Sequence, residues 1–153
     1  MARSSRGGEA DAFRDVPRSA ESRSRTRIEF RIPTQAEPIS HFTDAVQAGD
    51  LLFVSGVVPV DAERRLVGGD DVVAQARAVF ANMGEVLTAA GCTFADVVKV
   101  TVFLTDVADR PLVNPVRQEV FGETRPASTL VEVSALVIPG ARIEVEAVAL
   151  VPR

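Results

Sequence analysis

The chain has 153 residues, the length of one domain, and can bury a core without disulfides or a structural metal. Hydrophobic residues make up 46% and charged residues 25%, as in globular proteins, and the net charge of −4 argues against nucleic-acid binding. One cysteine, Cys92, leaves no internal disulfide and favours a reducing compartment. With no apolar run long enough for a membrane span, we expect a cytoplasmic protein without membrane or nucleic-acid partners.

The first 26 residues differ in composition from the rest. They hold six arginines among Ser, Gly and acidic residues, with no apolar period, which predicts a flexible tail before a domain over 27–153. An RNA-binding arm or an arm docked on a neighbouring subunit are the alternatives. The segment lacks the apolar core of a secretory signal, and its acidic residues are unusual in a transit peptide.

Strands dominate the first part of the predicted domain. Alternation of charged and apolar side chains predicts a strand over 27–32, followed by a proline-containing loop. A short strand over 45–48 turns at Gly49 into an apolar strand over 51–55, which Gly56 stops. Residues 61–69 then form a polar loop.

Two helices and three further strands complete the domain. Apolar residues with a 3.6-residue period predict a helix over 71–90, with Asp70 or Asp71 as its N-cap and Gly91 at its end. A strand over 97–105, a helix over 111–121 with Pro111 in its first turn, and strands over 129–136 and 143–151 follow.

This order predicts an α+β domain with one sheet and both helices on one face. The opposite face is also partly apolar, since Val148 and Leu150 of the last strand lie on it beside Glu144 and Glu146. An apolar face without a helix to cover it needs another partner. A second copy of the chain is the simplest one, so we expect a homo-oligomer.

An ordered series of segments resembles the RidA/YjgF family. It comprises 49–59 (GDLLFVSGVVP), 75–77 (QAR), 98–106 (VKVTVFLTD), 113–114 (VN), 125–127 (RPA), 131–133 (VEV) and 143–149 (IEVEAVA). The resemblance implies a chorismate-mutase-like single mixed sheet with two helices on one face. It also implies a homotrimer with clefts between subunits and cofactor-independent hydrolysis of imines and enamines to 2-keto acids and ammonia.

Several residues that the family uses in the cleft are replaced here. Ser128 stands where deaminating members have an arginine that pairs with the substrate carboxylate. Phe42 replaces a tyrosine, Val57 a glutamine and Leu130 a cysteine. Each replacement makes the predicted cleft less polar, so we expect weak activity on amino-acid-derived imines.

Two matches to the family are kept. Asn114 corresponds to an asparagine that lines the cleft, and Glu146 to the glutamate that positions or activates water. Glu146 is either a salt-bridged strand residue or an acid/base group whose pKa rises because Phe42, Leu130 and Val57 surround it.

The loop before the second strand holds the single histidine, His41, next to Phe42, and Asp44 where a glutamine is commoner. His41 is either an exposed loop residue or an acid/base partner of Glu146. We count Phe42, Asp44, Val57, Asn114, Ser128 and Leu130 as candidate substrate-binding residues. One histidine and one cysteine exclude a His/Cys metal cluster within the chain, and Cys92 is predicted to be a buried filler.

The predicted function is therefore a divergent RidA-like enzyme. It acts on a neutral or apolar imine, enamine or related metabolite by glutamate-assisted proton transfer or hydrolysis, without cofactor or metal. A non-catalytic ligand-binding or chaperone-like trimer is the alternative. A ribonuclease or translation inhibitor is the weakest interpretation, because the chain is acidic and has neither Trp nor Tyr for base stacking.

Overall fold

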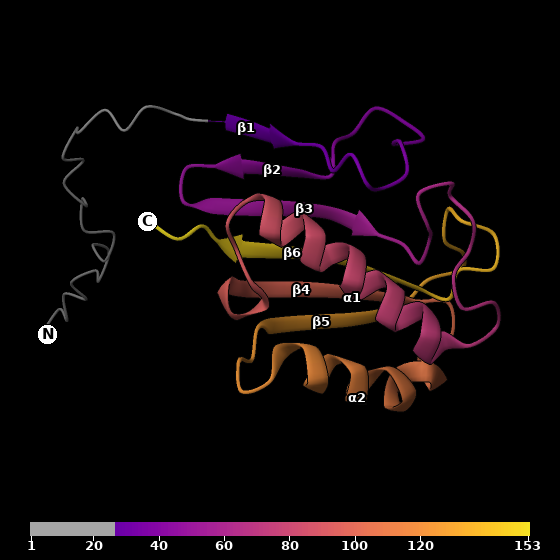
Figure 1. The fold of residues 1–153 in the computed structure, drawn as a ribbon. Coiled ribbons are helices and arrows are strands. Elements are labelled where there is room, and N and C mark those ends of the chain that lie inside the picture. Colours follow the sequence, from indigo (N-terminus) through magenta and orange to yellow (C-terminus); the bar gives the residue numbers. More distant parts are fainter. Residues whose placement is uncertain (1–26) are drawn as a thin grey trace, which may run out of the picture.

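The computed structural model describes residues 27–153, and the predicted tail over 1–26 lies outside this range. The described chain forms one six-stranded sheet in the order β1-β2-β3-β6-β4-β5 (Figure 1). The strands are β1 (Arg27–Phe30), β2 (Ala45–Ala48), β3 (Leu51–Val57), β4 (Val97–Leu104), β5 (Ala127–Glu132) and β6 (Ile143–Leu150). Neighbouring strands are antiparallel except for β4 and β5, which are parallel, so the sheet is mixed as predicted.

The two α-helices, α1 (Val72–Ala89) and α2 (Arg110–Phe121), lie on the same face of this sheet (Figure 1). Asp71 caps α1, because its side chain accepts hydrogen bonds from the backbone N–H groups of Val73 and Ala74. Gly91 follows the helix with a φ of 73°, a conformation that favours glycine. Two short 3₁₀ helices, Phe94–Asp96 and Val107–Asp109, precede β4 and α2.

The hydrophobic core lies between the helices and the sheet. Every second residue of the central strands points into it, as the two-residue period of a strand requires. Its large, fully buried members are Leu52, Val79, Phe80, Met83, Val86, Leu87, Val100, Val102, Leu104, Val113 and Ile143.

The opposite face of the sheet is covered by no element among residues 27–153. Phe53 and Leu150 remain 46% and 49% exposed there, beside the polar Lys99 and Glu146. The expectation of a second, partly apolar face is therefore confirmed for the single chain.

The penultimate strand differs from the prediction, because β5 spans Ala127–Glu132 instead of 129–136. It can pair only as far as β4 extends, and the register ends at Leu104 opposite Glu132. Glu132 then accepts a hydrogen bond from the Val107 N–H at 2.8 Å. The apolar alternation beyond this point belongs to the loop before β6, where Val137 is 62% exposed.

A buried glutamine connects the loop before α1 and the loop before β6 at one end of the sheet. Gln75 of α1 is 0% exposed, and its Nε2 donates to the carbonyl oxygens of Gly69 at 2.6 Å and Gly140 at 3.0 Å. Its Oε1 accepts from the Arg142 N–H at 2.7 Å, directly before β6 begins. Gln75 thus fixes the start of β6 against α1.

We expect Gln75→Leu to lower the free energy of unfolding by about 2–4 kcal/mol, because leucine fills similar space but leaves these backbone groups without their partners. Urea unfolding of the two proteins measures the difference. Arg77→Leu, two residues along on the exposed side of α1, is the control and should change stability by less than about 1 kcal/mol. Equal stability of Gln75→Leu and wild type would contradict this role.

Candidate functional site

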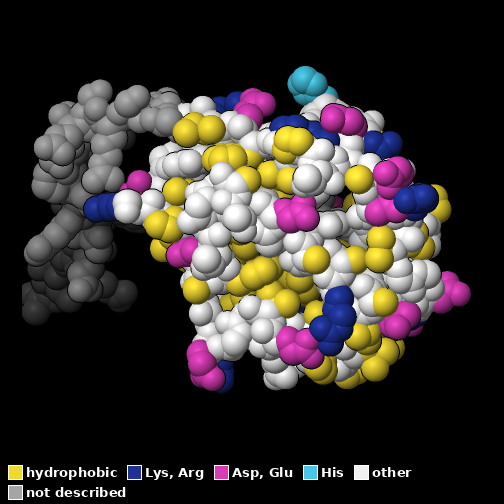
Figure 2. Space-filling model, in the orientation of Figure 1, with side chains coloured by type: hydrophobic (Ala, Val, Ile, Leu, Met, Phe, Trp, Pro, Cys, Tyr) yellow, Lys and Arg dark blue, Asp and Glu magenta, His cyan; other side chains and the backbone are white. Residues whose placement is uncertain are grey.

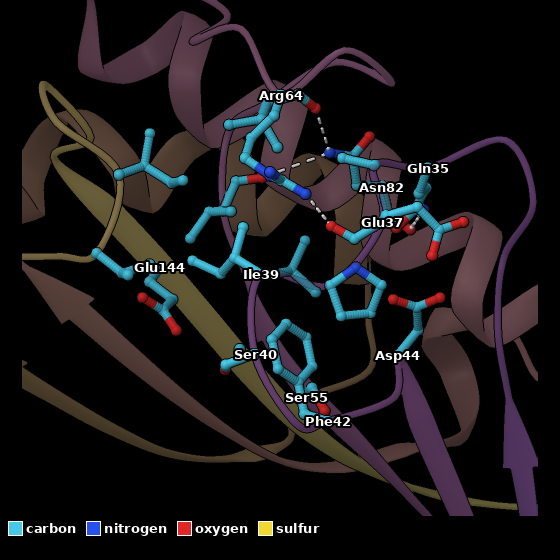
Figure 3. Close-up of a pocket in the computed structure, with 18 of the residues that line it drawn as sticks. Gln35, Glu37, Ile39, Ser40, Phe42, Asp44, Ser55, Arg64, Asn82 and Glu144 are labelled. Carbon is cyan, nitrogen blue, oxygen red and sulfur yellow. Dashed lines mark hydrogen bonds between the residues drawn. The ribbon is translucent and has the colours of Figure 1, made fainter.

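A pocket of about 360 Å³ lies at the end of β3 and the start of β6, under the loop that precedes β2 (Figure 3). Most of its wall is apolar, and Phe42, Val57, Val58 and Ile138 contribute to it. Figure 3 shows Glu144 on one side of the pocket, facing the loop that carries Ile39 and Ser40. The pocket therefore combines an apolar wall with a carboxyl group, as small-molecule sites commonly do.

Glu144 is held close to the backbone of β3. A Cβ atom added to Gly56 would overlap the Glu144 Oε1, so the carboxyl group occupies the space that a larger residue would fill. The side chain is half-buried, and this burial raises the pKa of Glu144 above its usual value, with a smaller contribution from the nearby charge of Glu146. Glu144 is thus suited to hold a proton closer to neutral pH than an exposed glutamate.

Other polar groups of the pocket hold its loop in place. Asp44 accepts from the Ile32 N–H at 2.6 Å and from Nη1 of Arg31 at 2.7 Å, so its carboxylate has structural partners. Ser55 Oγ donates to the Thr43 carbonyl at 2.6 Å. The guanidinium of Arg64 donates to the Glu37 carbonyl across the pocket rim (Figure 3).

The structure brings three of the predicted binding residues together in this pocket, namely Phe42, Asp44 and Val57. Glu146 lies outside it, exposed on the open face of the sheet in a hollow of about 260 Å³ with Lys99 and Thr101. The expected wall of Phe42, Leu130 and Val57 around Glu146 does not form within the chain. Alternate residues of a strand share a face but lie about 6–7 Å apart along it. The pocket at the strand end therefore receives Glu144 instead.

A second group of predicted residues lies at the α2–β5 edge of the domain. Asn114 is exposed on α2, and Ser128 is exposed on β5, where its Oγ accepts from Nη2 of Arg117 at 2.7 Å. Leu130 is partly buried against the core. Within one chain these residues and the pocket residues form separate groups. His41 is exposed and does not line the pocket (Figure 2, cyan).

Sequence reasoning missed Glu144 and Gly56. The segment 143–149 contains both glutamates at alternating positions, so the two-residue period cannot tell which of them reaches the strand end. Gly56 was recognised only as the end of a strand. Its close approach to Glu144 becomes visible once β3 and β6 are paired.

The described part of the chain offers no group of three His, Cys, Asp or Glu residues arranged to hold a metal ion. Cys92 is 2% exposed, and its burial raises the pKa of the thiol, which confirms the predicted filler role. None of the helices within residues 27–153 has both the length and the apolarity that a membrane span requires.

Comparison with known proteins gives consistent matches. The family model described as Endoribonuclease L-PSP matches residues 33–151. A RutC family protein of Pyrococcus horikoshii is 41% identical over 113 residues, which cover 74% of this chain and 89% of that protein. The human 2-iminobutanoate/2-iminopropanoate deaminase is 38% identical over 112 residues, 73% of this chain and 81% of that protein. The crystal structure of RidA from Psychrobacter superposes with a TM-score of 0.75 at 31% identity, covering 80% of this chain and 98% of that one.

Glu144→Gln should stabilise the fold at neutral pH. A raised pKa means that the folded state binds the proton more tightly than the unfolded state, so stability falls as pH rises from the ordinary value of 4.5 through the raised value. The glutamine variant lacks this loss. Urea unfolding should therefore show a higher free energy for Glu144→Gln at pH 7 and a smaller difference at pH 4. An unchanged difference across this range would contradict the burial of the carboxyl group.

Gly56→Ala should move the Glu144 carboxyl group with little loss of stability, because the overlapping atom is at the end of a flexible side chain. We expect ligand binding in the pocket to weaken about tenfold or more, since about 1 Å of misplacement is costly in a site. Thermal unfolding and ligand titration measure the two effects. Gly84→Ala is the matched control, because its new Cβ would only contact the Phe94 ring at 3.4 Å. Equal binding by both variants would argue against this placement of Glu144.

Proposed function

Because this chain belongs to the RidA/YjgF family, we propose that it is a cofactor-independent hydrolase of imines or enamines. The observation that carries the proposal is the half-buried carboxyl group of Glu144 in an apolar pocket. Glu144 makes no hydrogen bond or ion pair with another residue among 27–153, so its proton is available to a ligand. The human relative, by its name, deaminates two small imino acids.

The proposed reaction needs one water and one group that moves a proton. The protonated carboxyl of Glu144 donates to the imine nitrogen, and the resulting carboxylate takes a proton from the water that adds to the imine carbon. Glu144, protonated again by the water, then donates this proton to the amino nitrogen of the carbinolamine and takes the hydroxyl proton as the C–N bond breaks, which releases ammonia and leaves the ketone. A raised pKa favours this role because it keeps part of the carboxyl population protonated closer to neutral pH.

We propose that the complete cleft forms between copies of the chain in a homotrimer. Two observations support this. The candidate residues fall into two groups on separate parts of the domain, and the exposed apolar face of the sheet offers a surface for association. In this arrangement the pocket with Glu144 faces the α2–β5 edge of the neighbouring copy, and each cleft then contains Phe42 and Val57 from one chain with Asn114, Ser128 and Leu130 from the next.

The proposed substrate has a larger apolar body than the small imino acids. Support comes from the part of the pocket wall formed by Phe42, Val57, Val58 and Ile138, which is apolar. The charged Asp44 and Arg64 of the same pocket bind other groups of the chain. Ser128 has no guanidinium of its own, which is why the sequence predicts weak activity on small amino-acid-derived imines. We therefore expect an imine with a branched apolar side chain to be hydrolysed faster than 2-iminopropanoate.

The test is hydrolysis of imines generated in situ, with 2-iminopropanoate and 4-methyl-2-iminopentanoate as substrates and ammonia release as the measure. Glu144→Gln should lower kcat about 100-fold or more, as expected for loss of a general acid. Glu146→Gln and His41→Asn in the same assay test the sequence-based candidates. A large loss with either of them and none with Glu144→Gln would reassign the acid/base group.

Absence of turnover on both imines, together with intact binding of small molecules, would favour the alternative of a non-catalytic ligand-binding or chaperone-like trimer. A ribonuclease function has less support, because the net charge is −4 and no Trp or Tyr is present. RNA cleavage that disappears when residues 1–26 are removed would overturn that judgement.

A further inference from the structure

Arg117 of α2 is a partly buried cation without an acidic partner. Three arginines among residues 27–153 are half-buried, namely Arg31, Arg117 and Arg142. Arg31 pairs with Asp44 at 2.7 Å and Arg142 with Asp109 at 2.7 Å, whereas no carboxylate of the described chain pairs with Arg117. The Nε of Arg117 is also buried without a hydrogen-bond partner. A desolvated guanidinium in this state leaves a charge to be compensated from outside the chain.

The surroundings of Arg117 direct its guanidinium toward the surface of the α2–β5 edge. Its Nη2 donates to Ser128 Oγ at 2.7 Å, and Ser128 is exposed. Asn114, three residues earlier, shares this side of the helix and is also exposed. Glu119, the nearest acidic residue on the helix, is held instead by Arg77 of α1 at 2.6 Å and 3.0 Å.

We propose that Arg117 binds the carboxylate of the substrate, and that Ser128 positions the guanidinium for this contact. A planar guanidinium matches a carboxylate in a bidentate pair, and the Asn114 amide can donate to the same anion. The inference rests on the proposed function, since the neighbouring copy's pocket would hold the apolar body and the imine carbon. The substrate is then an imino acid with an apolar side chain, so the expectation of a neutral substrate is replaced by that of an anion.

A purely structural role, in which Arg117 only ties α2 to β5, is the competing explanation. The two roles predict different effects of charge on ligand binding. If Arg117 only holds α2 against β5, its loss should weaken binding of acidic and neutral ligands alike. If Arg117 binds a carboxylate, its loss should weaken binding of a 2-keto acid but not of its amide. The experiment therefore compares 2-oxobutanoate with 2-oxobutanamide, two unreactive probes of nearly the same shape.

Calorimetric titration of the full chain should show that wild type binds 2-oxobutanoate more tightly than 2-oxobutanamide. Arg117→Gln should weaken binding of the acid about 10- to 100-fold, the usual effect of losing a charge-assisted hydrogen bond, and leave binding of the amide unchanged. Arg125→Gln removes an exposed arginine near the same edge and is the matched control. No preference of wild type for the acid, or equal losses for acid and amide, would overturn the proposal.

Ser128→Asp provides a second test if Arg117→Gln does not fold. It keeps the guanidinium and places a carboxylate beside it, which should compete with the ligand and abolish the preference for 2-oxobutanoate. Retention of that preference would overturn the proposal. Turnover that depends on Glu144 but has the same KM in Arg117→Gln would refute this site and leave the hydrolase function standing. Arg117-dependent binding of the acid without imine turnover would support this site and refute the hydrolase function.

Discussion

The hydrogen bonds of the Gln75 amide are the constraint on which the candidate site depends. They connect Gly69, Gly140 and Arg142 to α1 at the point where β6 begins, and this start sets which β6 residues reach the end of the sheet. Glu144, two residues after Arg142, enters the pocket as a result. A neutral amide is well suited to this place, since it donates and accepts in the buried core without carrying a charge.

The same packing that places Glu144 also works against the fold. Its carboxyl group lies over the backbone of Gly56, partly removed from water, and the nearby Glu146 adds a repulsive charge. Both effects disfavour the ionised form and reduce stability at neutral pH. The core between helices and sheet offsets this cost, so the domain tolerates a partly desolvated acid at the pocket. Functional sites commonly show such local conflicts between stability and chemistry.

Most of the architecture was predictable because it follows from local periods and caps. The sequence predicts a helix over 71–90 with Asp70 or Asp71 as its N-cap, and the structure has α1 over Val72–Ala89 capped by Asp71. The single sheet and its second apolar face also follow from side-chain spacing and element order. The end of β5 was not predictable, because it depends on where β4 stops pairing. The sequence also could not show that Glu144, and not Glu146, lines the pocket. Both glutamates lie on one face of β6, and only their distance from the end of the sheet differs. Phe42, Asp44 and Val57 line one pocket, and their role in binding stays a prediction.

The hydrogen bond from Arg117 to Ser128 joins a helix to an edge strand. The position of this arginine on the helix bears on how the residues of such clefts change between related proteins. A long flexible side chain anchored on a helix can deliver the same charged group that another protein places on the strand. The strand position then needs only a small hydroxyl and is released to vary. A protein can in this way lose an ionic residue at one position of its sequence and keep the ionic character of its cleft. A comparison of aligned sequence positions, taken one at a time, would record the loss of an arginine. In the folded molecule an arginine from a different position supplies the same charge.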